Sequence, residues 1–396
     1  MVRLKGHRLS LILGVLACLA ACGGPGTPSP TPSSSLSASN GPSSSASPSA
    51  SMSPAPPLGI VLGNWTSGST YSVALVDTGG HKVASTTAQV ASEYVGSATP
   101  GETATLPVSW SASRLYYLDG DSNVKYLAPD GQTGTAATVP GSRTERVAFA
   151  VSPDDSRIAV AVMTWANQST FTEQLYDDDL TGGHRVELAI VSASFSRDAN
   201  GGTWSSDMEW PIGWRAGKIV VGLSLPRQQF PPSPVPPDAQ GGYKLMDASN
   251  GSTAGSVCAG GDGVSLPQPA GVLCLPGGMP NGHLQVRDWT DGVSRDLGAA
   301  LCLSPSALSA HGVDAVPETA ASAGGCHDTG RIDIVQGSST TPSVSGTAVG
   351  WIDDGTLVFT SGGSPPSASL SVATIASGQT ASVGPGTFVG ALPGGL

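Results

Sequence analysis

The sequence predicts an all-β fold made of repeated four-stranded antiparallel sheets, and three observations lead to this prediction. From about residue 58 onwards, short apolar runs rich in β-branched residues alternate with turns rich in Gly and Asp. Apolar residues with helical spacing do not persist over a dozen positions in this part of the chain. A pattern of four strands returns about every 40 residues, and this period is typical of β-propellers, in which each repeat is one blade.

One repeat shows the pattern most clearly. Residues 145–154 and 156–162 form two apolar strands, a third strand runs to Tyr176, and residues 185–190 form the fourth after a Gly-Gly turn. Segments with the same order of strands and turns cover residues 107–131, 208–251 and 347–378, and weaker ones lie around 271–287 and 312–334.

The two ends of the repeat region complement each other. Residues 387–392 resemble an innermost strand with no blade after it, whereas residues 59–62, 71–76 and 83–90 are three strands that lack an innermost one. Joined, they complete one blade, and this closure removes exposed sheet edges. The count is then seven blades, or six if the segment near residue 312 is irregular.

The segment 151–159, Val-Ser-Pro-Asp-Asp-Ser-Arg-Ile-Ala, carries a family resemblance. It resembles the blade signature of TolB-like and WD-repeat-like propellers, although the Trp-Asp dipeptide of WD repeats is missing. The resemblance implies a β-propeller of the kind that serves as a platform for partners in the cell envelope.

The N-terminus predicts lipid attachment. Arg3, Lys5 and Arg8 precede an apolar run at residues 9–19 that is too short to span a bilayer comfortably. Leu19-Ala20-Ala21-Cys22 follows, and it resembles the lipobox of bacterial lipoproteins. The resemblance implies a signal peptide at 1–21, fatty acyl chains such as palmitate on Cys22, and a location on the extracytoplasmic side of the cell membrane. A plain secretory signal with an incidental cysteine is the alternative.

The next segment has the composition of a disordered tether. Residues 25–57 are almost entirely Ser, Pro, Ala, Thr and Gly, which cannot bury a core that offsets the entropy of ordering. We therefore divide the chain into the signal peptide at 1–21, the lipidated cysteine and tether at 22–57, and the propeller at 58–396. The low Lys content and high Ala, Gly and Pro content resemble actinobacterial lipoproteins.

The charge of the chain argues against nucleic acid as a partner. Removing the three basic residues of the signal from the 18 Lys and Arg leaves 15 against 29 Asp and Glu, a net charge of −14. An acidic body without a basic stripe repels phosphates and anionic lipid surfaces. Membrane association would therefore come from the acyl chains, and two chains hold well.

The cysteines of the exported part indicate disulfides. Four remain: Cys258, Cys274, Cys302 and Cys326. The first ends an outer strand and the second lies in the second strand of the next blade, and the other two repeat this relation. Among the three possible connectivities, we therefore predict Cys258–Cys274 and Cys302–Cys326. A zinc site is disfavoured because no Cys-x-x-Cys occurs and only His327 adjoins a cysteine.

Long insertions gather on one face of the predicted propeller, at residues 192–207 and 226–242. The second insertion is rich in proline, which presets a polyproline II conformation and lowers the entropy cost of docking. We predict that it contacts a partner through these residues: Arg227, Phe230, Pro231, Pro232, Pro234, Pro236 and Pro237. The alternative is that both insertions are tolerated surface loops.

No catalytic, metal or cofactor site is predicted. Asp119, Asp121 and Asn123 alternate like the start of a calcium loop, but the glycine and glutamate that complete one are missing, which favours a hairpin turn. No histidine lies in a recognisable Ser-His-Asp context, and the Gly-x-Ser-x-Gly elbow is absent.

Three tryptophans, Trp110, Trp210 and Trp351, fall at positions that the repeat suggests are equivalent in the innermost strands. We expect them to pack between blades; a stacking surface for a ligand in the central channel is the alternative.

These observations predict a monomeric, lipid-anchored propeller that binds or scaffolds a protein partner at the cell envelope. The alternative is a propeller enzyme or small-ligand receptor that uses the central channel. Carboxylates and histidines gathered at the channel would favour the enzyme, and an apolar or Pro-rich patch would favour the binding module. The partner and the pathway are not encoded in any motif.

Overall fold

The structure is a computed structural model, in which Pro54–Leu396 forms a compact unit by itself. Within the described residues, no helix is long and apolar enough to cross a membrane. The structure describes residues 55–65, 69–92, 106–167, 169–198, 201–206, 208–224, 242–259, 261–263, 265–276, 282–299, 306–322, 325–336, 339–361 and 369–396.

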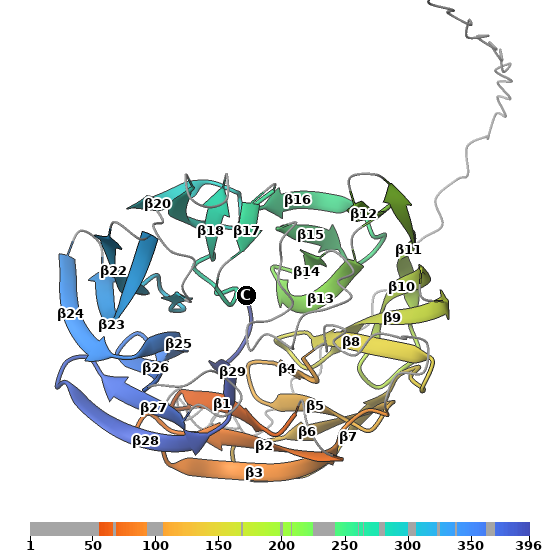
Figure 1. Ribbon diagram of the computed structural model, residues 1–396. Coiled ribbons are helices and arrows are strands. Elements are labelled where there is room, and N and C mark those ends of the chain that lie inside the picture. The colour runs from red at the N-terminus through yellow and green to blue at the C-terminus, as the bar shows by residue number, and fades with distance from the viewer. Residues whose placement is uncertain are drawn as a thin grey trace, which may run out of the picture. The chain divides into compact units, whose positions relative to one another are not determined.

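Seven antiparallel sheets surround a common centre, and each sheet is one blade (Figure 1). Blade 1 contains β29 (Thr387–Leu392), β1 (Leu58–Gly63), β2 (Thr70–Val76) and β3 (Lys82–Gln89). Blade 2 contains β4 (Val108–Trp110), β5 (Leu115–Asp119), β6 (Asn123–Leu127) and β7 (Thr133–Thr138). Blade 3 contains β8 (Glu145–Val151), β9 (Arg157–Asn167), β10 (Thr170–Asp179), β11 (Val186–Asp198) and β12 (Gly201–Trp204).

The remaining four blades follow the same order, with the first strand of each nearest the centre. Blade 4 contains β13 (Met208–Arg215), β14 (Lys218–Ser224), β15 (Tyr243–Asp247) and β16 (Thr253–Val257). Blade 5 contains β17 (Gly261–Gly263), β18 (Val272–Pro276), β19 (His283–Arg287) and β20 (Val293–Ala299). Blade 6 contains β21 (Ala307–Leu308), β22 (Asp314–Ser322), β23 (Gly325–Gln336) and β24 (Ser339–Ser345). Blade 7 contains β25 (Thr347–Asp353), β26 (Thr356–Thr360), β27 (Ser369–Thr374) and β28 (Gln379–Pro385).

The prediction of seven blades is confirmed, and the six-bladed alternative is wrong because the weak segment near residue 312 forms blade 6. The predicted closure is also present: β29 pairs with β1, and Leu58 lies opposite Leu392. One interpretation needs correction. Most of the insertion at residues 192–207 is strand rather than loop, because β11 extends to Asp198 and pairs with β12.

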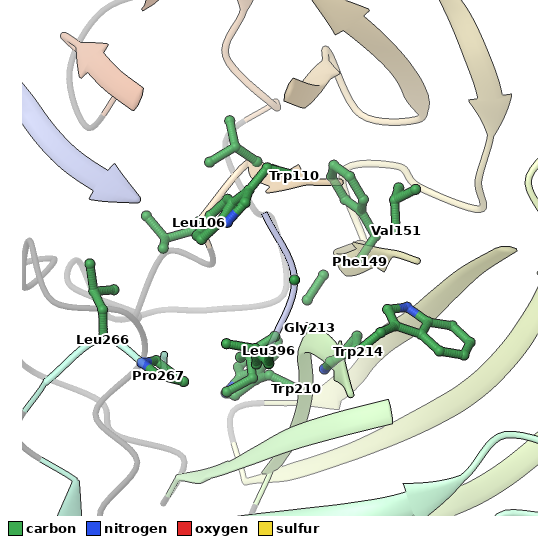
Figure 2. Close-up of a pocket in the computed structure, with 15 residues that line it drawn as sticks. Leu106, Trp110, Phe149, Val151, Trp210, Gly213, Trp214, Leu266, Pro267 and Leu396 are labelled. Atoms are coloured by element: carbon green, nitrogen blue, oxygen red, sulfur yellow. The ribbon is translucent and has the colours of Figure 1, made fainter. Parts of the chain in front are cut away.

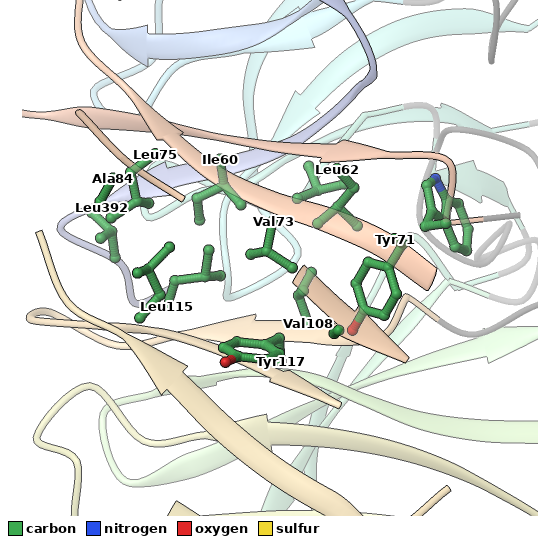
Figure 3. Packing of buried hydrophobic residues seen from close by; sticks show 14 of the residues in the cluster. Ile60, Leu62, Tyr71, Val73, Leu75, Ala84, Val108, Leu115, Tyr117 and Leu392 are labelled. Atoms are coloured by element: carbon green, nitrogen blue, oxygen red, sulfur yellow. The ribbon is translucent and has the colours of Figure 1, made fainter. Parts of the chain in front are cut away.

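Apolar side chains pack at every seam between neighbouring blades. The described buried residues fall into seven clusters, one for each seam. At the seam between blades 1 and 2, Ile60 and Val73 face Leu115 and Tyr117 (Figure 3). Alternation along each strand sends every second side chain to one seam and the rest to the other. The ring is therefore held together by its seams.

A buried serine closes the hairpin between the first and second strands of several blades. In the signature segment of blade 3, Ser152 Oγ accepts the backbone N–H of Arg157 at 2.9 Å and donates to Asp154 Oδ1 at 2.6 Å. Ser309 of blade 6 accepts the N–H of Val313 in the same way at 2.9 Å. The Ser-Pro-Asp signature therefore has a structural role in shaping a turn.

Candidate functional site: an apolar pocket at the centre of the ring

The central pocket is a cavity of about 60 Å³ that lies between the first strands of blades 2, 3 and 4. Its other walls come from Leu266 and Pro267, which follow β17, and from the segment that follows β29 (Figure 2). None of the described lining residues carries a titratable side chain; their apolar members include Trp110, Phe149 and Trp214. The pocket therefore offers apolar contact and stacking surfaces rather than acid–base chemistry.

Strand register corrects the equivalence expected among the tryptophans. Trp110 lies opposite Leu115, Trp214 opposite Ile219, and Trp351 opposite Leu357, each near the start of the second strand. Trp210 lies four residues before Trp214 in the same strand. The residue of blade 4 that is equivalent to Trp110 and Trp351 is therefore Trp214 and not Trp210. The repeat pattern in the sequence does not reveal this difference of four residues.

Two of these tryptophans fasten a blade to the preceding one. Trp214 Nε1–H donates to the carbonyl of Ala150 in β8 at 2.9 Å, and Trp351 Nε1–H donates to the carbonyl of Ala307 in β21 at 3.2 Å. Both indoles are almost completely buried. Both pack between blades, a role that the sequence predicts for Trp351 and not for Trp214.

Trp110 lines the pocket as Trp214 does, but it differs from Trp214 in being partly exposed. Its indole packs against backbone: a Cβ atom at Gly390 would lie 2.5 Å from its Cζ2 atom, and one at Gly394 only 2.0 Å from its Cδ1 atom. Glycine is needed at both positions because any side chain would displace the ring.

The segment Pro393–Leu396 lies at the centre of the ring, where Figure 1 marks the C-terminus. The backbone N–H of Gly394 donates to the carbonyl of Ser111 at 2.7 Å, and that of Leu396 donates to the carbonyl of Trp214 at 3.0 Å. The Leu396 side chain lies against Gly213, where a Cβ atom would be 2.6 Å from Leu396 Cδ1. Sequence reasoning missed this arrangement; the apolar, glycine-rich run after the last strand was its only signal.

Buried charged groups lie at the seams and not in the central pocket. Glu173 of β10 is 1% exposed, and both of its carboxyl oxygens accept the backbone N–H of Glu209 in β13, at 3.1 and 3.0 Å. Glu209 forms an ion pair with Lys244. Burial raises the pKa of Glu173 to about 8, and the Glu209 N–H only partly offsets this effect.

The candidate calcium residues are explained by structural hydrogen bonds. Asp119 accepts the N–H of Gln89 at 2.7 Å and pairs with Lys125, while Asp121 accepts both the N–H and the hydroxyl of Ser92, at 2.6 and 2.8 Å. These bonds tie blade 1 to the β5–β6 hairpin of blade 2. Within the described part of the chain, no group of three or more His, Cys, Asp or Glu residues is arranged to hold a metal ion.

Histidines form exposed pairs with aspartates at hairpins. His311 Nδ1 lies 2.7 Å from Asp354, and His283 Nδ1 lies 3.2 Å from Asp296. The serine near the first pair, Ser309, donates its hydroxyl to Asp354 and not to the histidine. The arrangement is therefore not that of a nucleophile activated by a base.

One predicted disulfide is present, between Cys258 and Cys274, with Cα atoms 5.8 Å apart. It joins the end of blade 4 to the second strand of blade 5. Cys302 lies outside the described residues, as does the side chain of Cys326, so the second pairing stays a prediction.

The other predicted site residues also lie outside the described part of the chain. They are Cys22 and the Pro-rich insertion with Arg227, Phe230, Pro231, Pro232, Pro234, Pro236 and Pro237.

No family model and no curated protein matches the chain. Among solved structures, it is similar to an oligogalacturonate lyase in complex with manganese, with a TM-score of 0.44 and 12% identity over 74% of this chain and 79% of that one. TolB from Acinetobacter baumannii gives a TM-score of 0.36 and 14% identity over 74% of this chain and 65% of TolB. The WD40 domain of SCAP from fission yeast gives 0.36 and 6% identity over 82% and 86%. Because all three TM-scores are below 0.5, none of these likenesses bears on what this chain binds or does.

Proposed function

We propose that this protein is a lipid-anchored, extracytoplasmic β-propeller that acts as a binding module at the cell envelope. The observation that carries the binding role is the central pocket, whose described lining is aromatic and aliphatic and has no titratable side chain. Covering such a surface with an apolar group lowers the free energy of the complex. None of the described lining residues is suited to acid–base catalysis. The function rests on the site and not on the fold, which many unrelated activities share.

The anchoring part of the proposal is supported by Leu19-Ala20-Ala21-Cys22 and by the uncharged Ser/Pro-rich segment after it. Substitution Cys22→Ser should move the protein from the membrane fraction to the medium of intact cells, since no other lipid site is predicted. A Ser33→Ala variant is the matched control, and it should stay with the membrane. A Cys22→Ser protein that is processed and still membrane-bound would contradict the anchor.

The binding part is tested by photo-crosslinking in intact cells. A photoreactive amino acid replaces Leu266, which lines the central pocket, or Val293, which is exposed on the outer strand of blade 5. We expect a crosslinked envelope protein at the first position and none at the second. Identical crosslinking patterns at both positions would remove the support for a specific pocket, and crosslinked small molecules at Leu266 would favour the receptor alternative.

A further inference from the structure

The central pocket holds a segment of this chain in the manner of a bound peptide. The N–H groups of Gly394 and Leu396, two residues apart, donate to carbonyls at the ends of the first strands of blades 2 and 4. The ring thus presents two backbone acceptors that recognise a short segment through its main chain.

The walls of the central pocket lie so close to the backbone of this segment that they select glycine. A Cβ atom at Gly394 would lie 2.0 Å from Trp110 Cδ1 and 2.8 Å from the Ser111 carbonyl oxygen. Gly395 has a φ of 126°, a backbone conformation that L side chains rarely adopt. Both positions therefore exclude larger residues.

The third position selects an apolar side chain. Leu396 packs against Gly213 and against the buried cluster between blades 4 and 5. The pocket around it is lined by Trp210, Trp214 and Leu266. A charged side chain here would lose its hydration without gaining a partner among these lining residues.

We infer that the central pocket is a recognition site for a Gly-Gly-Leu segment, and that residues 394–396 occupy it until a partner segment of the same chemistry replaces them. The resident segment is held by two backbone hydrogen bonds and one side chain, and Gly394 to Leu396 all keep partial exposure. It can therefore detach without opening the sheet that ends at Leu392. This inference rests on the proposed binding function and names its ligand.

The test uses the full chain in detergent micelles with residues 393–396 deleted, and the probe is the peptide acetyl-Pro-Gly-Gly-Leu-amide. Since Trp110, Trp210 and Trp214 line the pocket, we expect a saturable change in tryptophan fluorescence. Peptides with Ala in place of the first glycine, or Asp in place of leucine, should bind at least tenfold more weakly. The undeleted chain should also bind at least tenfold more weakly, because its own segment competes.

Equal binding of the three peptides, or no binding by a folded deletion variant, would overturn the inference. If the deletion variant fails to fold, Leu396→Ser in the full chain replaces it. This variant keeps both backbone donors, and it should bind the leucine peptide more tightly than the unsubstituted chain does; absence of this gain would also overturn the inference.

The outcome separates this inference from the proposed function. Peptide binding without any crosslinked envelope partner at Leu266 would leave the site standing and remove the envelope role. A crosslinked partner that excess leucine peptide does not displace, and that Leu396→Ser does not increase, would leave the binding role standing and remove the Gly-Gly-Leu site.

Discussion

The seam between blades 1 and 2 and the seam between blades 5 and 6 hold neighbouring blades together in different ways. Among the described residues, the first buries fifteen apolar side chains, whereas the second buries three: Leu273, Val286 and Leu308. The second seam also contains Arg295 of β20 paired with Asp314 of β22, whose carboxyl group is fully buried. The same guanidinium donates to the carbonyl of Gly312 at 2.7 Å.

The difference follows from the sequence of the two regions. Blades 5 and 6 come from the weakest strand patterns in the chain. Their first strands are short: β21 has two residues, and β17 has three, as β4 has. Among the described residues, few apolar side chains are buried at this seam, and an ion pair adds to the contact across it. A buried pair is costly to break, yet it contributes little compared with apolar residues of the same volume. The two seams should therefore respond differently to substitution.

The largest effect is expected from breaking the ion pair on one side. Arg295→Met leaves the buried Asp314 carboxyl without its cation, and we expect a loss of about 3–5 kcal/mol in the free energy of unfolding. The double variant Arg295→Met/Asp314→Leu should recover most of the loss. Urea denaturation at pH 7.5 measures both. A double variant as unstable as the single one would show that the intact ion pair stabilises the fold. It would contradict the view that the loss in the single variant comes from an unpaired buried carboxylate.

Large-to-small substitutions test the apolar seam. Leu115→Ala, at a fully buried position between blades 1 and 2, should cost about 2–5 kcal/mol because a tightly packed site cannot collapse around the cavity. Leu308→Ala, between blades 5 and 6, is the matched variant and should cost less, since fewer side chains surround it. Equal losses in denaturation experiments would contradict the contrast between the seams.

The disulfide joins the end of blade 4 to blade 5, next to the seam between blades 5 and 6. It stabilises the fold by restricting the unfolded chain. Cys258 and Cys274 are 16 residues apart, and closing a loop of this size stabilises by about 3 kcal/mol in the chain-entropy description. The variant Cys258→Ala/Cys274→Ala should lose this amount at neutral pH. Reduction of the unsubstituted protein should lower the midpoint at least as far, because it would also break the predicted Cys302–Cys326 bond. A much larger loss in the variant than on reduction would indicate a packing defect at Cys274.

The smallest effect, when it is counted per pH unit, concerns the seam between blades 3 and 4. Burial raises the pKa of Glu173 to about 8 from an ordinary value of 4.5, so the folded protein holds a proton that the unfolded chain releases. The resulting stability is complete below about pH 4.5 and is lost as the pH rises through about 8. Between these values, stability should fall by at most about 1.4 kcal/mol per pH unit.

Glu173→Gln mimics the protonated carboxyl and isolates this contribution. Glu209 and Lys244, the charged groups that face it, are unchanged in the variant, and Asp314, whose burial raises its pKa to about 7, titrates equally in both proteins. The variant should gain stability relative to the unsubstituted chain as the pH rises from 5 to 8. A constant difference across this range would show that Glu173 titrates at its ordinary value.

Much of the fold can be predicted from the sequence because strand alternation and turn residues are local signals. The four segments with strong patterns correspond to blades 2, 3, 4 and 7, and the two weak ones to blades 5 and 6. The fifth strand of blade 3 was missed because the Ser, Arg and Asp residues between positions 194 and 198 look like a loop, although Phe195–Asp198 pairs with Gly201–Trp204. Pairing partners are set by tertiary contacts that a strand's own sequence does not specify.

The candidate site was less predictable because it is made by residues far apart in the chain. Trp110 and Trp214 are recognisable as large apolar residues, but their contact with Gly394 and Leu396 depends on the ring closing around them. The offset between Trp210 and Trp214 shows the same limit. Both lie in β13, and only the pairing of Trp214 with Ile219 shows which of them matches Trp110.

The pairing of β29 with β1 has a consequence for how the protein folds. Leu58 and Leu392 lie 334 positions apart, so the sheet that contains both cannot form until the chain has been synthesised as far as Leu392. Closing a loop of this length carries a large entropy cost, and contacts of such separation form late. Until then β1 keeps an open edge, to which another chain can add a strand. The rate of ring closure therefore determines how long the newly made protein stays prone to aggregation.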